Sequence, residues 1–163
     1  MKIVLVEPEI PQNTGNIGRT CAALGAQLNL IEPLGFSLEE KMVKRAGLDY
    51  WHLLDYAIYQ DFDAFLVANP RVPLFFLSTK GARVYTDLSY PADCALVFGK
   101  ESAGLPESLL QAHPGSCVRI PLREEARSIN LSNSVAIAAF EVMRQNNFPG
   151  LLLEGSPRTF SWT

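Results

Sequence analysis

The sequence is short of cysteine, of charge and of long apolar runs, and each shortage argues against a class of protein. Its three cysteines, Cys21, Cys94 and Cys117, are far apart and form no CxxC pair. This argues against a disulfide framework or a zinc site and predicts a reduced, cytoplasmic protein. No apolar run approaches the length of a membrane span, so we expect no contact with a membrane. Met1 leads directly into the strand-like KIVLVE, and we therefore expect no signal peptide.

Charge and histidine are scarce as well. Charged residues make up 19% of the 163 residues and the formal net charge is −3. The chain therefore lacks the broad basic footprint of a nonspecific nucleic-acid binder. Two local basic clusters remain, and each is either a solvated face or a local RNA contact. They are Lys41, Lys44 and Arg45, and Arg119, Arg123 and Arg127. The two histidines, His52 and His113, belong to no HxxxH or cysteine–histidine arrangement, so we expect neither a metal site nor a catalytic triad.

Apolar, strand-like runs alternate with helix-like segments along the chain. The expected strands are residues 2–6, 27–31, 57–59, 74–77, 95–98 and 118–120, and the expected helices are 13–24, 38–47, 62–67, 106–112 and 133–145. This alternation predicts an α/β fold with a mostly parallel sheet and helices on both faces. Ligands bind such sheets at the carboxyl ends of the strands, so the loops that follow the strands are candidate sites. Residues after about 149 lack periodicity and resemble a loose tail.

Two of these loops are rich in glycine. Residues 9–19, EIPQNTGNIGR, form a Gly/Asn-rich turn that matches neither GxGxxG nor GxxxxGK[ST], so a dinucleotide fingerprint and a P-loop are absent. Arg19, one turn into the next helix, can offer a charged fork to a phosphate or ribose oxygen. In residues 97–105, VFGKESAGL, Gly99 permits a close backbone approach and Glu101 can accept hydrogen bonds. The alternative interpretations are an ordinary helix start and an ordinary strand-to-helix turn.

A third loop carries a cluster of small polar residues directly before the last helix. Its members are Ser128, Asn130, Ser132, Asn133 and Ser134. Such residues cap helix N-termini, but one cap needs fewer of them. The surplus favours a loop that holds a polar ligand beside the helix N-terminus, and the alternative is an overcapped helix.

The last helix has apolar residues on two opposite sides. At helical spacing, one face carries Val135, Ala138, Ala139, Val142 and Met143, and roughly the opposite side carries Ile137 and Phe140. A helix buried all round within one protomer would show this pattern. We favour the interpretation that one face packs on the sheet and the other on a second subunit.

Taken together, the three loops resemble the three sequence motifs of the SPOUT methyltransferases, in their SpoU branch. The matching segments are, in order, NTGNIGRTCAALG, LVFGKESAGLP and IPLREEARSINLSNSVAIAAFE. Further segments, such as VEPEIPQNTGN and KRAGLDYWH, resemble the minimal single-domain group that methylates the wobble ribose of tRNA. The resemblance covers a single domain, residues 1–150, and leaves the tail 151–163 outside it. Motif 2 departs from close relatives, with Lys100 where proline is common and Ala103 where arginine is common.

The resemblance implies a fold, a cofactor and a set of site residues. The fold is the SPOUT α/β domain with a deep C-terminal trefoil knot, and the cofactor is S-adenosyl-L-methionine. The implied cofactor-binding residues are Leu77, Ser78, Gly99, Glu101, Ile120, Leu122, Ser128 and Leu131. Arg19 is the implied catalytic residue, which handles the target ribose and its phosphate. The residues expected to bind the RNA are Asn13, Asn16, Lys41, Lys44, Arg45, Arg123 and Asn130. Family members are homodimers with active sites shared between subunits, which implies that Ile137 and Phe140 lie in a dimer interface.

The resemblance also implies a reaction. We expect methyl transfer from S-adenosylmethionine to the ribose 2′-hydroxyl of a tRNA nucleotide, the wobble cytidine or uridine in the anticodon arm. No metal is needed, because a sulfonium is already a strong electrophile. Two alternatives stay open. One is 2′-O-methylation at another tRNA site or in ribosomal RNA, and the other is a non-catalytic RNA-binding protein on the same fold.

Overall fold

A parallel β-sheet forms the centre of the molecule. The computed structural model describes residues 1–37 and 51–162. Within these residues the strands are β1 (Lys2–Val6), β2 (Gln27–Ile31), β3 (Tyr56–Tyr59), β4 (Leu74–Leu77), β5 (Arg83–Val84), β6 (Ala95–Phe98) and β7 (Cys117–Arg119). They form one seven-stranded sheet in the order β3-β2-β1-β6-β4-β7-β5, and every neighbouring pair is parallel. The predicted α/β class with a parallel sheet is confirmed.

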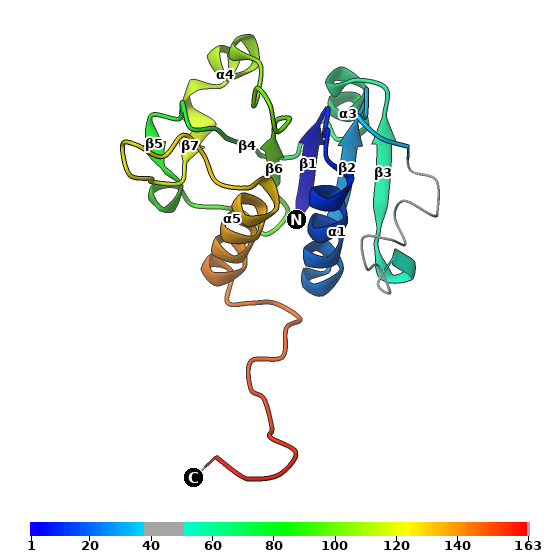
Figure 1. Cartoon of the computed structure of the whole chain (residues 1–163), viewed down its shortest axis with the longest axis vertical. Coiled ribbons are helices and arrows are strands. Elements are labelled where there is room, and N and C mark those ends of the chain that lie inside the picture. Colours follow the sequence, from blue (N-terminus) through cyan, green and yellow to red (C-terminus); the bar gives the residue numbers. More distant parts are fainter. Residues whose placement is uncertain (38–50, 163) are drawn as a thin grey trace.

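Helices cover both faces of this sheet. The described helices are α1 (Pro11–Leu24), α3 (Phe62–Ala68), α4 (Glu107–Ala112) and α5 (Leu131–Gln145). Helices α1 and α5 lie side by side on one face (Figure 1), and α3 and α4 pack on the other. Strand β1 contributes to both layers, because Ile3 and Leu5 face the first cluster whereas Val4 and Val6 face the second. This burial on both faces explains why the strands read as continuous apolar runs.

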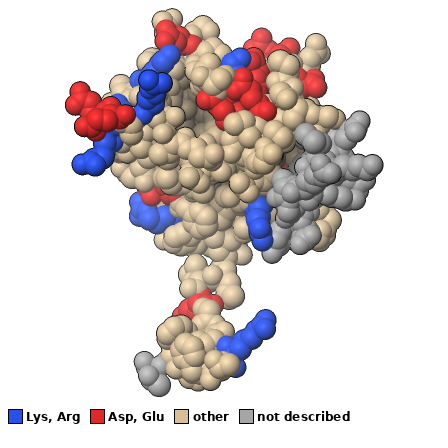
Figure 2. Space-filling view, in the orientation of Figure 1, with Lys and Arg blue, Asp and Glu red and all other residues tan. Residues whose placement is uncertain are grey.

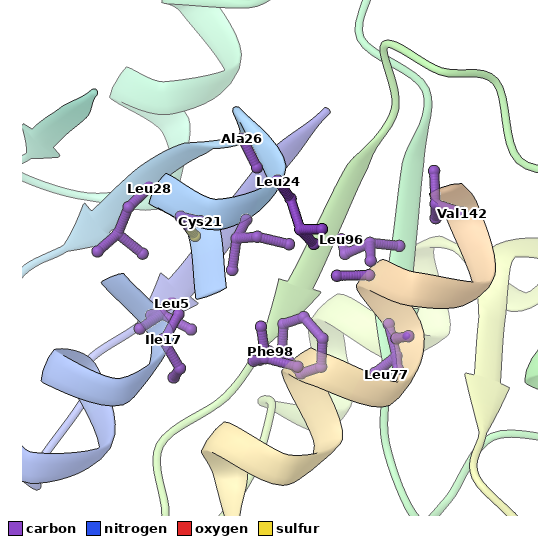
Figure 3. Packing of buried hydrophobic residues seen from close by; sticks show 14 of the residues in the cluster. Leu5, Ile17, Cys21, Leu24, Ala26, Leu28, Leu77, Leu96, Phe98 and Val142 are labelled. Atoms are coloured by element: carbon purple, nitrogen blue, oxygen red, sulfur yellow. The ribbon is translucent and has the colours of Figure 1, made fainter. Parts of the chain in front are cut away.

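The core under α1 and α5 is built mainly from aliphatic side chains, together with the rings of Tyr90 and Phe98. Figure 3 shows Ile17 and Cys21 of α1 packed near Leu5, and Val142 of α5 packed over the strands that carry Leu77 and Leu96. All of these side chains are buried. Helices α1 and α5 pack against each other, and their N-terminal ends lie side by side at the carboxyl end of the sheet (Figure 1).

Most element boundaries agree with the sequence prediction, and the differences have local causes. Helix α1 begins at Pro11, two residues earlier than expected, because proline has its φ set for a first helical turn. Helix α5 begins at Leu131, two residues early, with Asn130 as its N-cap. Strand β3 begins at Tyr56, and the two-residue strand β5 was not expected. The expected helix 38–47 lies outside the described residues.

Strand β7 is inserted between β4 and β5, two strands that follow each other in the chain. The loop that joins them lies directly on β7: the Ser78 N–H donates to the Val118 carbonyl at 3.0 Å, and a Cβ on Gly81 would come within 2.4 Å of the Val118 carbonyl carbon. Farther along, the Tyr90 N–H donates to Oε1 of Gln145 in α5 at 2.9 Å. The segment between β4 and β6 therefore borders both β7 and α5.

Residues 151–162 leave the domain without regular secondary structure. Leu151 and Phe148 still pack against the core, and the chain beyond them extends away from the body (Figure 1). Among the residues that the structure describes, no helix combines the length and the apolar character needed to cross a bilayer.

Candidate active site

A pocket of about 470 Å³ opens at the carboxyl ends of the three neighbouring strands β6, β4 and β7. Its apolar wall includes Leu77, Ile120 and Leu131, and its polar wall includes Ser78 and Ser128. Side chains that follow strands far apart in the chain meet here, because the carboxyl ends of parallel strands share one edge of the sheet. All eight predicted cofactor-binding residues line the pocket, as do Asn13 and Asn130.

The loop after β6 forms one side of the pocket, and its tight packing restricts which residues it can contain. The Gly104 N–H donates to the Lys100 carbonyl at 2.8 Å and closes a tight turn. A Cβ on Gly99 would lie 2.0 Å from the Gly104 carbonyl carbon and 2.2 Å from the Leu105 nitrogen. Only glycine fits at position 99, since any side chain would meet backbone atoms that cannot rotate away.

Two carboxylates clasp this loop to the start of α1 and the segment before it, and each accepts hydrogen bonds from the other's loop. Glu101 accepts hydrogen bonds from the N–H of Glu9 at 2.8 Å, from the N–H of Ile10 at 3.3 Å and from Nδ2 of Asn13 at 2.9 Å. Glu9 in turn accepts from the N–H and the hydroxyl of Ser102 at 2.9 and 2.8 Å. The hydrogen bonds from Ser102 lower the pKa of Glu9. We call these five hydrogen bonds the carboxylate clasp.

Lys100 reinforces the clasp. Its Nζ lies 2.7 Å from Oε2 of Glu7, and this ion pair raises the pKa of Lys100. Glu7 directly follows β1 and has a left-handed backbone, with φ of 52°. The ammonium group of Lys100 is therefore paired with a carboxylate in the loop after β1. Lys100 also lines the pocket.

The third loop joins the same network through two asparagines. Asn130 caps α5 by accepting a hydrogen bond from the Ser132 N–H at 2.9 Å, which confirms the capping interpretation. Its Nδ2 donates to Oδ1 of Asn13 at 2.9 Å. Asn13 is buried, and its amide links Glu101 on one side to Asn130 on the other. All three sequence motifs thus meet at one end of the sheet.

Comparison with known proteins agrees with this geometry. The model of the SpoU rRNA Methylase family matches residues 1–140. The chain belongs to this family. It is 46% identical over 154 residues to the tRNA (cytidine(34)-2′-O)-methyltransferase of Escherichia coli, a match that covers 94% of this chain and 98% of the relative.

Two solved structures extend the comparison. One, whose subject is the 2-OH methylation of C/U34 on tRNA, has a TM-score of 0.85 and 44% identity, over 90% of this chain and 95% of the other. The second is an AdoMet-bound rRNA methyltransferase from Sinorhizobium meliloti, with a TM-score of 0.77 and 27% identity over 88% of this chain and 55% of the other.

Several predicted residues of this SpoU family chain lie away from the pocket. Arg19 and Asn16 are exposed on α1, Arg123 is exposed in the loop after β7, and none of the three lines the pocket. Ile137 and Phe140 are 37% and 48% exposed on α5. Their roles stay predictions. Lys41, Lys44 and Arg45 lie outside the described residues.

Sequence reasoning missed some residues at the site. Glu9 was not singled out, although it is the first residue of the loop 9–19 and one of the two carboxylates of the clasp. Thr79 and Lys80 line the pocket beside Ser78, and Arg127 lines it beside Ser128. The polar run STK after an apolar strand was the available signal for the first two.

Neither histidine lines the pocket. The ring of His113 stacks on that of Phe76 with centroids 4.6 Å apart, which supports a structural role, and His52 lies in a surface turn at residues 51–53. Over residues 1–37 and 51–162, histidine, cysteine and acidic side chains nowhere gather in threes that could hold a metal ion.

Proposed function

We propose that this chain transfers a methyl group from S-adenosyl-L-methionine to the ribose 2′-hydroxyl of nucleotide 34, the wobble position, of a tRNA. The observation that carries the proposal is the pocket: all eight residues expected to bind the cofactor line one cavity at the carboxyl ends of β6, β4 and β7. The name of the E. coli relative and the subject of the solved structure at 44% identity support the reaction and the target.

The pocket suits the proposed cofactor. Its volume of about 470 Å³ lies within the range of small-ligand sites. Leu77, Ile120 and Leu131 offer apolar surface for an adenine ring, and Ser78 and Ser128 offer hydrogen-bonding groups for a ribose and an amino acid end. When bound, S-adenosylmethionine supplies a methyl group already activated by its sulfonium.

The protein's own residues then have to position the RNA. Bound S-adenosylmethionine would supply the methyl group, the ribose 2′-oxygen would accept it, and the hydroxyl proton would pass to a water or to a phosphate oxygen of the RNA. We assign Arg19 to holding the target ribose and its phosphate, because a guanidinium stays protonated in proteins and is a poor base. The clasp holds the start of α1, the helix that carries Arg19.

We also propose a homodimer that completes the site. Arg19 is exposed and does not line the pocket of its own protomer, so a second subunit is needed to bring an arginine to the target. The exposed pair Ile137 and Phe140, on the side of α5 away from the core, is the proposed contact. Alanine at Phe140 is expected to shift the mass in solution toward the monomer.

Two further proposals concern the fold and the compartment. The insertion of β7 between β4 and β5, with residues 78–91 bordering both β7 and α5, supports a knotted C-terminal part within a domain of residues 1–150. The cytoplasm is the proposed compartment. Cys21, Cys94 and Cys117 are buried free thiols, which suits a reducing environment.

Methyl transfer to an anticodon stem-loop tests the proposed function. The substrate carries cytidine at position 34, and the control RNA carries 2′-deoxycytidine there and cannot accept the methyl group. We expect transfer to the first RNA only. Failure of the wild-type chain to bind S-adenosylmethionine in calorimetry would instead favour a non-catalytic RNA-binding protein, and transfer to another nucleotide would favour a different target.

The role of Arg19 has a matched control. Arg19→Ala is expected to lose at least 100-fold in methyl transfer, because positioning groups are worth that much, while its affinity for the cofactor stays unchanged. Arg71→Ala removes an exposed arginine at the amino end of β4, away from the pocket, and is expected to behave as wild type. Near-wild-type turnover by Arg19→Ala contradicts the assignment.

A further inference from the structure

The C-terminal tail exposes an unusual amount of apolar surface. Leu152 and Leu153 are exposed, and Phe160 and Trp162 are 57% and 74% exposed. Large apolar side chains gathered on a segment without structure of its own indicate a contact surface rather than a solvated end. The tail also lies beyond residues 1–140, which the family model matches.

The tip of the tail combines two aromatic rings with one arginine. Arg158, Phe160 and Trp162 lie within five residues of one another, at a bend of the chain at residues 158–159. The rings of Phe160 and Trp162 meet edge to face, with centroids 4.9 Å apart and planes at 82°. Residues 155–162 contain no acidic side chain. The tip therefore offers flat apolar faces beside a positive charge.

This chemistry suits stacking on unpaired nucleic acid bases. Every base has a π face that stacks on aromatic rings and on guanidinium planes, whatever its sequence. The rest of the chain offers little nonspecific attraction for RNA, since the net charge is −3. On the face shown in Figure 2, basic side chains lie singly or in small groups, and no broad positive patch is visible. Stacking can supply affinity that charge does not.

The tail is long enough to bring its tip to the RNA. Helix α5 has 15 residues and spans about 22 Å between its N-terminal end at the pocket and its C-terminal end. The 11 residues from 152 to 162 extend over about 36 Å when fully stretched. Anchored at Leu151, the tail can run back along the length of α5 and reach the pocket end of its own protomer or of a second subunit.

We propose that Arg158, Phe160 and Trp162 form an RNA-binding tip that stacks on unpaired bases next to the nucleotide being methylated. The inference rests on the proposed function, because the unpaired bases are those of the anticodon loop. One base stacked on an aromatic ring changes affinity by roughly 5- to 150-fold. Removal of both rings is therefore expected to weaken RNA binding at least tenfold.

The test compares two double variants of the same tail. Phe160→Ala/Trp162→Ala removes the stacking rings, and Leu152→Ala/Leu153→Ala removes exposed apolar groups of the same tail outside the tip. None of the four residues lines the pocket or packs in the hydrophobic core, so the domain should fold in both variants. For each variant the measurements are the Kd for the anticodon stem-loop, the Kd for S-adenosylmethionine and the mass in solution.

We expect the ring variant to bind the stem-loop at least tenfold more weakly, with unchanged cofactor affinity and mass, and the leucine variant to stay within twofold of wild type. Unchanged RNA affinity in the ring variant overturns the inference. So does a ring variant that changes only its mass in solution, since the rings would then contact a second copy of the chain. Wild-type methyl transfer, measured in parallel, separates this outcome from failure of the proposed function.

Discussion

Gly99→Ala is the substitution whose effect the structure determines most directly. The added Cβ would lie 2.0–2.3 Å from three backbone atoms of Gly104 and Leu105, where an ordinary contact is at least 3.4 Å. The neighbours are backbone in a turn closed by the Lys100–Gly104 hydrogen bond, so no side chain can rotate to make room. The loop must move by about 1.4 Å, which exceeds the adjustment that ordinary overpacking requires.

This clash should lower both stability and ligand affinity. Overpacking against neighbouring side chains lowers the free energy of unfolding by about 1–3 kcal/mol. A clash with backbone atoms should cost at least the upper value of this range. For a chain of this size, about 3 kcal/mol corresponds to a fall in Tm of roughly 6–12 °C. Because residues 99–105 line the pocket, we expect the affinity for S-adenosylmethionine to fall at least tenfold. Thermal unfolding and calorimetry measure the two effects.

Gly115→Ala is the matched control. A Cβ at Gly115 meets nothing within 4 Å, and its φ is not positive. We expect a change of less than about 1 kcal/mol in the free energy of unfolding and no change in ligand affinity. If Gly99→Ala bound the cofactor as tightly as Gly115→Ala and unfolded at the same temperature, the described packing of the loop against residues 104 and 105 would be wrong.

Two further predictions concern ionisable side chains away from the pocket. Glu141 is 8% exposed and accepts two hydrogen bonds from Arg144 and one from Gln145, and these partners, the arginine above all, lower its pKa. Its stabilising effect is therefore present above the ordinary carboxyl pKa of 4.5 and is lost as pH falls through the lowered value. Glu141→Gln should cost about 1–2 kcal/mol at pH 7 and show a shallower loss of stability than wild type in acid titrations of urea unfolding; parallel curves would contradict this. Burial raises the pKa of Cys21 to about 12 and that of Cys94 to about 11, so a thiol reagent at pH 8 should label neither until the protein unfolds. Immediate labelling of either residue in the native protein would show that its burial is overestimated.

Much of the fold was predictable from local patterns. The alternation of apolar strands and amphipathic helices predicted a parallel α/β sheet, because hydrophobic periodicity reflects burial within each element. Asn130 was predictable as part of a cap, since its partner Ser132 is two residues away. Strand β5 was not predictable, because a run of two residues shows no hydrophobic periodicity. Its pairing with β7 also depends on a segment far away in the sequence.

Some features of the candidate site were likewise predictable from local sequence, and others depend on the tertiary structure. Local sequence determined which loops carry polar and glycine residues, and so where a ligand could bind. Tertiary structure decided that Glu9 and Glu101, 92 positions apart, bind each other's loops. This contact exists because β1 and β6 are neighbours in the sheet, which sets their following loops side by side. Spacing along the chain does not encode that adjacency, because it arises from the order in which the strands pair.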